Sequence, residues 1–180
     1  MLEWSLEALA GVCRRVVVAV PAGFEEPPDR VLGGASRSES VRNALAAAPE
    51  ATVAVVHDAA RPLVTRELVE RCLSELGELE GAIAAARVTD TVKEGEDGRV
   101  LRTLDRTRLW AVQTPQVFRA DALRSALDAP PETLAAATDD ASLVESAGGT
   151  VRLVEAPPEN LKVTTPLDMR IAEAILESRC

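Results

Sequence analysis

Apolar positions along the chain switch repeatedly between helical spacing and short β-branched runs. Leu2, Leu6 and Leu9 recur at helical spacing and predict a first helix. The run 14–20 ends at Pro21 and predicts a buried strand. The same periodicities predict a second buried strand at 52–56 and further strands at 30–32, 82–88 and 150–154. They also predict helices at 41–48, 67–79, 120–127 and from Pro166 onward.

Strands that alternate with helices at this rhythm indicate right-handed crossovers. The sequence therefore predicts an α/β, Rossmann-like fold with a mostly parallel sheet and flanking helices. Between 91 and 102 the pattern becomes charged around Glu96-Asp97-Gly98, which is typical of a β-hairpin. We expect this hairpin to protrude as an arm from a single domain spanning residues 1–180.

Composition excludes several classes of function. The chain is 47% hydrophobic with a formal net charge of -9, and a positive field for nucleic acid or anionic membrane is missing. No apolar run approaches the roughly 18 residues of a membrane span. Cys13, Cys72 and Cys180 are scattered and have no nearby metal-ligand pattern, which favours reduced thiols. We therefore expect a cytoplasmic protein that binds neither nucleic acid nor membrane.

Candidate chemistry gathers in three segments, at 33–41, 57–62 and 160–164. The second, His57-Asp58-Ala59-Ala60-Arg61-Pro62, brings an acid and a base into one loop directly after a predicted strand. Ligands of parallel α/β sheets lie at the carboxyl ends of the strands. These segments therefore predict a phosphate-handling site.

The first segment places Gly33-Gly34 before a helix start, followed by Arg37 and Ser40. Backbone N–H groups, a guanidinium and a hydroxyl could bind an anion or a ribose. An ordinary strand-to-helix turn with a surface arginine would look the same.

The other two segments also allow plainer interpretations. Asp58 and Arg61 could form a loop ion pair worth about 0 to 1 kcal/mol. We interpret His57 as structural. Lys162 alternates with its apolar neighbours and could be a solvated strand lysine, and Thr138 could serve only as the N-cap of the helix that follows.

Taken together, the three segments resemble the 2-C-methyl-D-erythritol 4-phosphate cytidylyltransferases. These enzymes of the non-mevalonate isoprenoid pathway join CTP to a sugar-alcohol phosphate and release pyrophosphate. The resemblance covers essentially the whole chain and implies a fold like that of the nucleotide-diphospho-sugar transferases. It also implies Mg²⁺ held mainly by the CTP phosphates, and a homodimer joined through an arm at 91–106.

The resemblance assigns roles to individual residues. Arg106 and Lys162 would position the attacking phosphate, with Arg106 and Thr91 serving the partner's site. Asp58 would lie near the metal and the triphosphate. The remaining assignments are CTP binding by Gly33, Gly34, Arg37, Ser40, Asp58 and Ala59, and acceptor binding by Arg61, Thr91 and Thr138.

Such a reaction needs no protein nucleophile, because a phosphate monoester already carries the attacking oxygen. Catalysis then consists of aligning two polyanions and neutralising the charge that builds on the α-phosphoryl group. Converging cations are therefore expected, rather than a Ser-His-Asp triad.

The same resemblance predicts that the chain begins after the family's first strand and glycine-rich nucleotide loop, with Met1 an internal methionine. We expect such a fragment to be inactive alone, and cooperative unfolding with CTP-dependent pyrophosphate release would contradict this. Two alternatives stay open. One is a ribitol-5-phosphate cytidylyltransferase, and the other is a non-catalytic remnant that binds nucleotide or pairs with an intact subunit.

Overall fold

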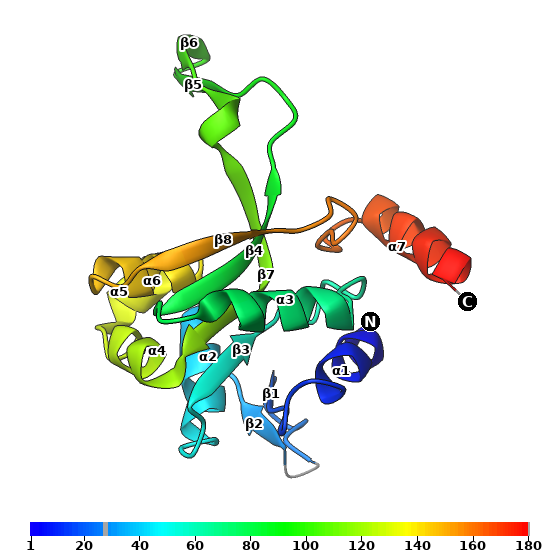
Figure 1. The fold of residues 1–180 in the computed structure, drawn as a ribbon, viewed down its shortest axis with the longest axis vertical. Helices are drawn as coiled ribbons and strands as arrows, with labels where there is room; N and C mark the ends of the chain where they lie inside the picture. Colours follow the sequence, from blue (N-terminus) through cyan, green and yellow to red (C-terminus); the bar gives the residue numbers. More distant parts are fainter. Residues whose placement is uncertain (27–28, 180) are drawn as a thin grey trace.

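A four-stranded sheet in the order β3-β7-β4-β8 lies at the centre of the body (Figure 1). Its strands are β3 (Val53–Val56), β4 (Gly81–Arg87), β7 (Trp110–Arg119) and β8 (Val151–Glu155). β3, β4 and β8 run in one direction, and β7 runs against both of its neighbours. The predicted α/β, mostly parallel architecture is confirmed, with one reversed strand inside the sheet.

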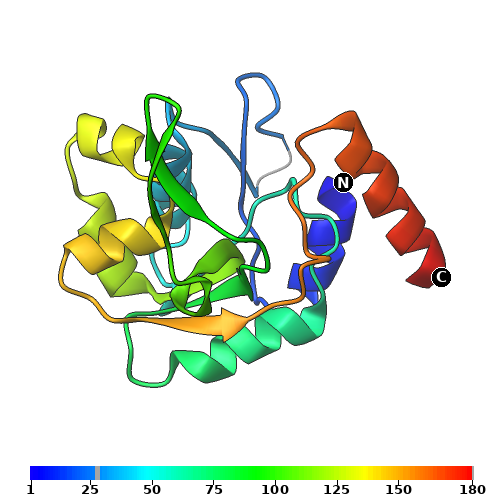
Figure 2. The same cartoon turned by 90° about the horizontal axis from the view of Figure 1, so that it is seen from above.

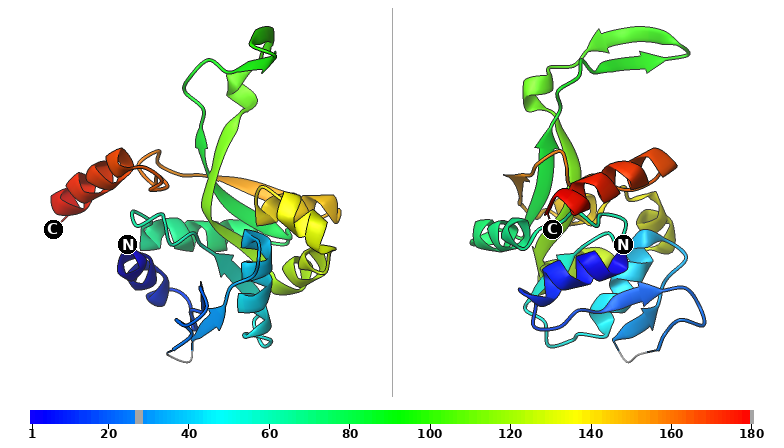
Figure 3. Two further views of the ribbon diagram at one scale, coloured as in Figure 1. Left: turned by 180° about the vertical axis from the view of Figure 1, so that it is seen from behind. Right: turned by 90° about the vertical axis from the view of Figure 1, so that its right-hand side faces the viewer.

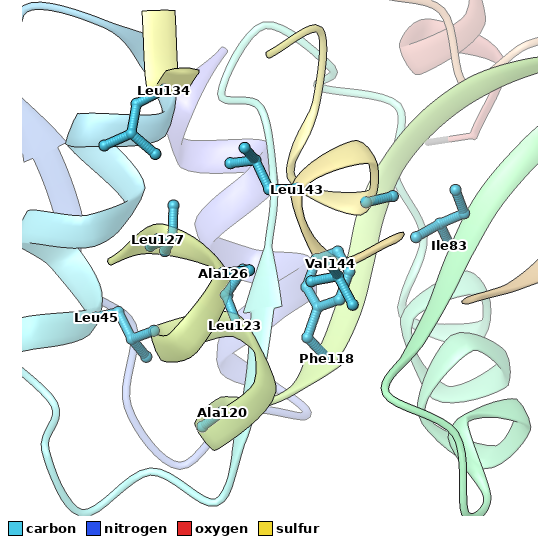
Figure 4. Packing of buried hydrophobic residues seen from close by; sticks show 11 residues of the cluster. Leu45, Ile83, Phe118, Ala120, Leu123, Ala126, Leu127, Leu134, Leu143 and Val144 are labelled. Atoms are coloured by element: carbon cyan, nitrogen blue, oxygen red, sulfur yellow. The ribbon is translucent and has the colours of Figure 1, made fainter. Parts of the chain in front are cut away.

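Helices cover both faces of this sheet. α3 (Arg66–Leu76) packs on the face that carries Ala84 and Val117. α4 (Ala120–Leu127) and α6 (Asp140–Ser146) pack on the other face. Neighbouring residues of a strand point to opposite faces, so each strand supplies both cores. The second core is drawn in Figure 4 and contains Leu45, Ile83, Phe118, Leu123, Leu127, Leu134, Leu143 and Val144.

The structure, a computed structural model, describes residues 1–26 and 29–179, so Cys180 lies outside the described part. The two terminal helices lie on the same side of the body (Figures 2 and 3). Within residues 1–26 and 29–179, no helix has the length and apolar character needed to cross a membrane. The remaining elements are α1 (Leu2–Ala10), β1 (Val18–Val20), β2 (Arg30–Leu32), α2 (Arg37–Ala46), β5 (Lys93–Glu96), β6 (Arg99–Thr103), η1 (Arg106–Arg108), α5 (Pro131–Ala136) and α7 (Pro166–Arg179).

Two predicted strands differ from the structure in length or burial. The strand predicted at 14–20 is β1, which is only three residues long and pairs with the equally short parallel strand β2. The strand predicted at 52–56 is β3, an edge strand whose Val53 is 37% exposed. Periodicity identified both strands, but it could not show which strands have neighbours on both sides.

The predicted hairpin is confirmed as β5 and β6, which extend away from the body (Figure 1). Its turn residues Asp97 and Gly98 have φ of 48° and 75°. Positive φ at both central residues is typical of a two-residue hairpin turn. The Asp-Gly pair therefore carries the local signal that places the turn.

Candidate functional site

Four charged side chains from separate parts of the chain meet beside the carboxyl end of β3. Asp58 follows β3 and receives Arg37 Nε on Oδ1 and Lys162 Nζ on Oδ2, each at 3.0 Å. Arg37 begins α2 and also donates from Nη1 to Asp140 Oδ2 at 2.6 Å. Lys162 lies in the loop before α7, and Asp140 begins α6. The result is an alternating chain of two cations and two carboxylates, which we call the charged cluster.

Burial within the charged cluster is uneven. The side chain of Asp140 is 0% exposed, Asp58 is 16% exposed, and Lys162 is 44% exposed. Burial raises the pKa of Asp58, but Arg37 and Lys162 outweigh it and hold the pKa below its usual range. Burial raises the pKa of Asp140, and Arg37 offsets this only in part. Lys162 at 44% and Arg37 at 33% are therefore the parts of the charged cluster that an anionic ligand can reach, and Lys162 is the more open of the two.

The Gly33-Gly34 turn does not offer free amides to an anion, which was one of the two kinds of ligand that its residues allow; its assignment to CTP stays a prediction. A Cβ on Gly34 would lie 2.2 Å from the Cβ of Glu39, so the turn needs glycine to pack on α2. Ser36 caps α2 in a capping box with Glu39. All four successive amides have internal partners: Gly33 on Val20 O at 2.8 Å, Gly34 on Ser40 Oγ at 3.0 Å, and Ala35 and Ser36 on Glu39 Oε2 at 2.7 and 3.1 Å.

A carboxylate within this turn disfavours a phosphate there, and the Ser40 hydroxyl is already bonded to the Gly34 amide and the Ser36 carbonyl. The turn fits the uncharged base or ribose of a nucleotide better than its phosphates. Of the groups predicted at 33–41, Arg37 is the one that the structure brings into the charged cluster.

His57 takes a structural position, as its sequence context predicts. Its Nε2 lies 3.2 Å from the carbonyl oxygen of Arg61, so Nε2 carries the proton and donates it. Nδ1 then accepts from the Thr114 hydroxyl at 3.0 Å, and the Thr114 oxygen accepts the Asp58 amide at 3.0 Å. Burial lowers the pKa of His57 to about 4, which keeps the imidazole neutral. This relay fixes the backbone of Asp58.

Arg61 makes no ion pair with Asp58. It is 9% exposed and donates from Nη1 to the carbonyl of Asn160 at 2.7 Å. The Asn160 side chain donates to Gln113 and Thr114 of β7, at 2.8 and 2.9 Å. Arg61 therefore ties the Asp58 loop to the loop that carries Lys162. Its predicted contact with a phosphate stays a prediction.

The other predicted residues lie outside the charged cluster. Ala59 is exposed in the loop after β3, and Thr91 is exposed at the base of the arm. Arg106 begins η1 on the arm and donates to the carbonyl of Thr89. Within the described residues, no contact joins Arg106 to Lys162. Thr138 is exposed beside the start of α6, where a cavity of about 470 Å³ is lined by residues of α5 and α6.

Thr138 is not the N-cap of α6, although its place before the helix left that role open. Asp139, one residue later, accepts the Ser142 amide on its side chain at 2.9 Å. Both residue types can cap a helix, so the sequence could not decide between them. The Thr138 side chain is therefore available for another contact.

Sequence reasoning missed Asp140, Thr114 and Asn160. A weak signal existed for Asp140, because Asp139-Asp140 supplies one more carboxylate than a helix cap needs. Asn160 lies in the candidate segment 160–164 but received no role there, and Thr114 carries no such signal. Their roles depend on contacts with residues 46 to 57 positions away in the chain.

Residues 1–178 match the protein family IspD, 2-C-methyl-D-erythritol 4-phosphate cytidylyltransferase. The chain belongs to this family. The cytidylyltransferase of that name from Bacillus licheniformis is 44% identical over 156 residues, which cover 86% of this chain and 67% of that protein. The one from Rubrobacter xylanophilus is 49% identical over 149 residues, covering 81% of this chain and 64% of that protein. The chain therefore spans about two thirds of the length of these IspD relatives.

Solved IspD structures share the fold. The crystal structure of 2-C-methyl-D-erythritol 4-phosphate cytidylyltransferase from Thermus thermophilus superposes with a TM-score of 0.85 at 36% identity, covering 98% of this chain and 88% of that one. Both the arrangement of elements and the sequence motifs thus agree with the family assignment. The IspD family transfers a nucleotidyl group, as its name states.

Proposed function

We propose that this chain binds CTP and 2-C-methyl-D-erythritol 4-phosphate for the cytidylyl transfer of the IspD family, which forms CDP-methylerythritol and pyrophosphate. The supporting observation is the charged cluster, in which Arg37 and Lys162 converge on Asp58 at the carboxyl end of β3. This is the edge at which α/β sheets bind ligands. The family match over residues 1–178 supplies the identity of the substrates.

The proposed mechanism assigns charge neutralisation to the chain's cations. The acceptor phosphate supplies the attacking oxygen, so the protein has to bring two polyanions together and offset their repulsion. Lys162 is the more exposed of the two cations on Asp58, and its Nζ would turn to the acceptor phosphate when that anion arrives. Arg37 stays between two carboxylates and would orient the nucleotide side of the site.

Magnesium fits this site as an ion that arrives with the triphosphate. Within the described residues, no group of three or more His, Cys, Asp or Glu side chains could enclose a metal. Mg²⁺ usually takes one or two carboxylates together with substrate phosphates, and Asp58 is positioned to be such a carboxylate. Bound there, Mg²⁺ would supply neutralisation of the triphosphate charge.

We further propose a homodimer joined through the arm. The supporting observation is that Val100 and Leu101 of β6 are 63% and 58% exposed on a hairpin that extends from the body. Arg106 and Thr91 lie on the same arm and would reach the partner's acceptor site. The unpaired thiols of Cys13 and Cys72 fit a reducing compartment, so we place the protein in the cytoplasm.

The direct test of substrate identity is titration of the chain with CTP in Mg²⁺, with UTP and ATP as matched controls. We expect saturable binding that prefers CTP. Pyrophosphate release is then assayed with 2-C-methyl-D-erythritol 4-phosphate and with ribitol 5-phosphate, the acceptor that the family match does not favour. Equal binding of all three nucleotides, or a response to ribitol 5-phosphate alone, would contradict the proposal.

The arm is tested separately by light scattering after size exclusion. The doubly substituted V100D/L101D arm should reduce a dimer to monomers, because burying two carboxylates in an apolar contact is costly. The control E96Q changes an exposed arm residue outside that apolar pair. An unchanged mass for V100D/L101D would show that the arm does not join the subunits.

A further inference from the structure

Asp140 is a buried carboxylate with a single partner. Its side chain is 0% exposed, its Oδ2 accepts from Arg37 Nη1 at 2.6 Å, and its Oδ1 is buried without a hydrogen-bond partner among residues 1–26 and 29–179. Removing a carboxylate from water is expensive unless both oxygens are satisfied. The position of Asp140 therefore calls for an explanation beyond local folding.

Helix capping does not explain it, because Asp139 already caps α6 through its own side chain. An acidic residue in the first turn also interacts well with the helix dipole, but a solvent-exposed side chain would do this without the cost of burial. Asp58 accepts a hydrogen bond from Arg37 Nε at 3.0 Å. Asp140 accepts the second side-chain hydrogen bond of the Arg37 guanidinium, from Nη1.

We infer that Asp140 is a positioning residue that fixes the Arg37 guanidinium against Asp58 and so sets the nucleotide side of the site. With Nε and Nη1 held, Nη2 is the donor of Arg37 for which no hydrogen bond is found within the described residues. Two fixed nitrogens determine where the third one of a planar guanidinium points. Asp140 thereby orients Arg37 Nη2 toward the nucleotide without contacting the nucleotide itself. This role rests on the proposed binding of CTP.

Asp140 also links two segments of the site. It lies two positions after Thr138, which is assigned to the acceptor phosphate, and 103 positions from Arg37 in the chain. A displacement of the start of α6 would therefore move the Arg37 guanidinium. Asp140 thus connects the two substrate regions through a contact that neither sequence motif contains.

The first experiment measures CTP binding in Mg²⁺ to the full chain and to D140N, R37Q and the double variant, with D139N as the matched control. Asn caps a helix as well as Asp does, and its amide can still pair with the Gln116 side chain that donates to Asp139 Oδ2 at 2.9 Å, so D139N should bind like the unsubstituted chain. D140N should bind at least about tenfold more weakly, the value of one charge-assisted hydrogen bond. The double variant should bind no more weakly than R37Q alone, because both changes act through one guanidinium.

The second experiment observes Arg37 without any ligand, through the exchange of its Nε–H with solvent by NMR. The signal should be protected in the unsubstituted chain and in D139N, and should exchange at least about tenfold faster in D140N. If D140N alone does not fold but the double variant with R37Q does, Asp140 again acts through Arg37.

The outcomes distinguish a failure of the nucleotide role of Arg37 from a failure of the positioning role of Asp140. If R37Q binds CTP as the unsubstituted chain does, the proposed nucleotide role of Arg37 fails, and the NMR signal alone decides the positioning. If R37Q weakens binding while D140N changes neither binding nor the Nε–H signal, the inference about Asp140 is overturned. Additive losses in the double variant would also overturn it.

Discussion

The body buries apolar residues on both faces of its sheet, whereas every residue of the two arm strands is exposed. In the body, β4 is buried over six of its seven residues. In the arm, the hairpin pairing is accompanied by surface contacts such as the ion pair of Arg102 with Glu94 and the hydrogen bond of Lys93 with Thr103. Exposed ion pairs contribute only about 0 to 1 kcal/mol.

The two regions therefore differ in what stabilises them. The body is held by packing within one chain, so substitutions there act on folding. The arm is held by a turn and a ladder, and we expect its apolar residues to act on association. Substitutions in the body or its site should therefore act differently from substitutions in the arm.

The largest difference should come from removing core volume. F118A deletes a side chain that is 0% exposed between the sheet and α4 (Figure 4), and should lower the free energy of unfolding by about 3 to 5 kcal/mol. L101A in the arm should change it by less than about 0.5 kcal/mol in the monomer. Urea unfolding at low protein concentration measures both. A similar loss for the two variants would show that the arm is part of the body's cooperative unit.

The second difference concerns the two lysines of the sequence, Lys162 in the charged cluster and Lys93 in the arm. K162A should weaken binding of the acceptor phosphate by roughly 10- to 100-fold, because a charge-assisted contact is worth about 1.5 to 3 kcal/mol. K93A removes a hydrogen bond to Thr103 on the arm and should leave that affinity within about twofold. Titration with 2-C-methyl-D-erythritol 4-phosphate measures both, and equal losses would place the acceptor elsewhere.

The third prediction is a loss of stability at acid pH that belongs to the body. Unfolded His57 gains a proton near its ordinary pKa of 6.5, whereas in the folded chain burial lowers this pKa to about 4. The unfolded state therefore binds more protons in that window, and stability falls as the pH is lowered through it. Between pH 7 and 5 the loss should be about 2 kcal/mol.

H57Q should remove most of this slope, while E96Q in the arm should leave it unchanged. Unfolding curves at pH 7, 6 and 5 provide the comparison. An identical slope in H57Q would mean that other groups cause the acid sensitivity.

The smallest effect should be local and confined to the arm. Gly98 has φ of 75° with open space around its Cβ position, so G98A should cost about 1 kcal/mol of backbone strain in the hairpin. Amide exchange across β5 and β6 should become roughly fivefold faster, while the amides of β4 keep their protection. G98N, which tolerates this conformation better, is the control, and faster exchange in β4 would contradict the separation of arm and body.

Much of the fold was available from the sequence, because each pattern that worked is local. The Asp97-Gly98 pair fixed the hairpin turn, and the small apolar run of β4 marked a buried strand. The reversed direction of β7 and the short pairing of β1 were not available. They depend on which strands become neighbours, which no local period records.

The site divides in the same way. Sequence motifs supplied Arg37, Asp58 and Lys162 as residue types suited to anions. They did not show that Glu39 and Ser40 occupy the amides of the glycine turn.

By itself, the amino-acid order determined the elements, the hairpin and the family, since periodicity, turn chemistry and motif strings are properties of neighbouring residues. Only the tertiary structure decided which carboxylate holds which cation. Asp140 lies 103 positions from Arg37 in the chain, and Asp58 lies 104 positions from Lys162. The physical reason is that ion pairing depends on distance in space and on burial. Both are set by how the sheet and its helices pack.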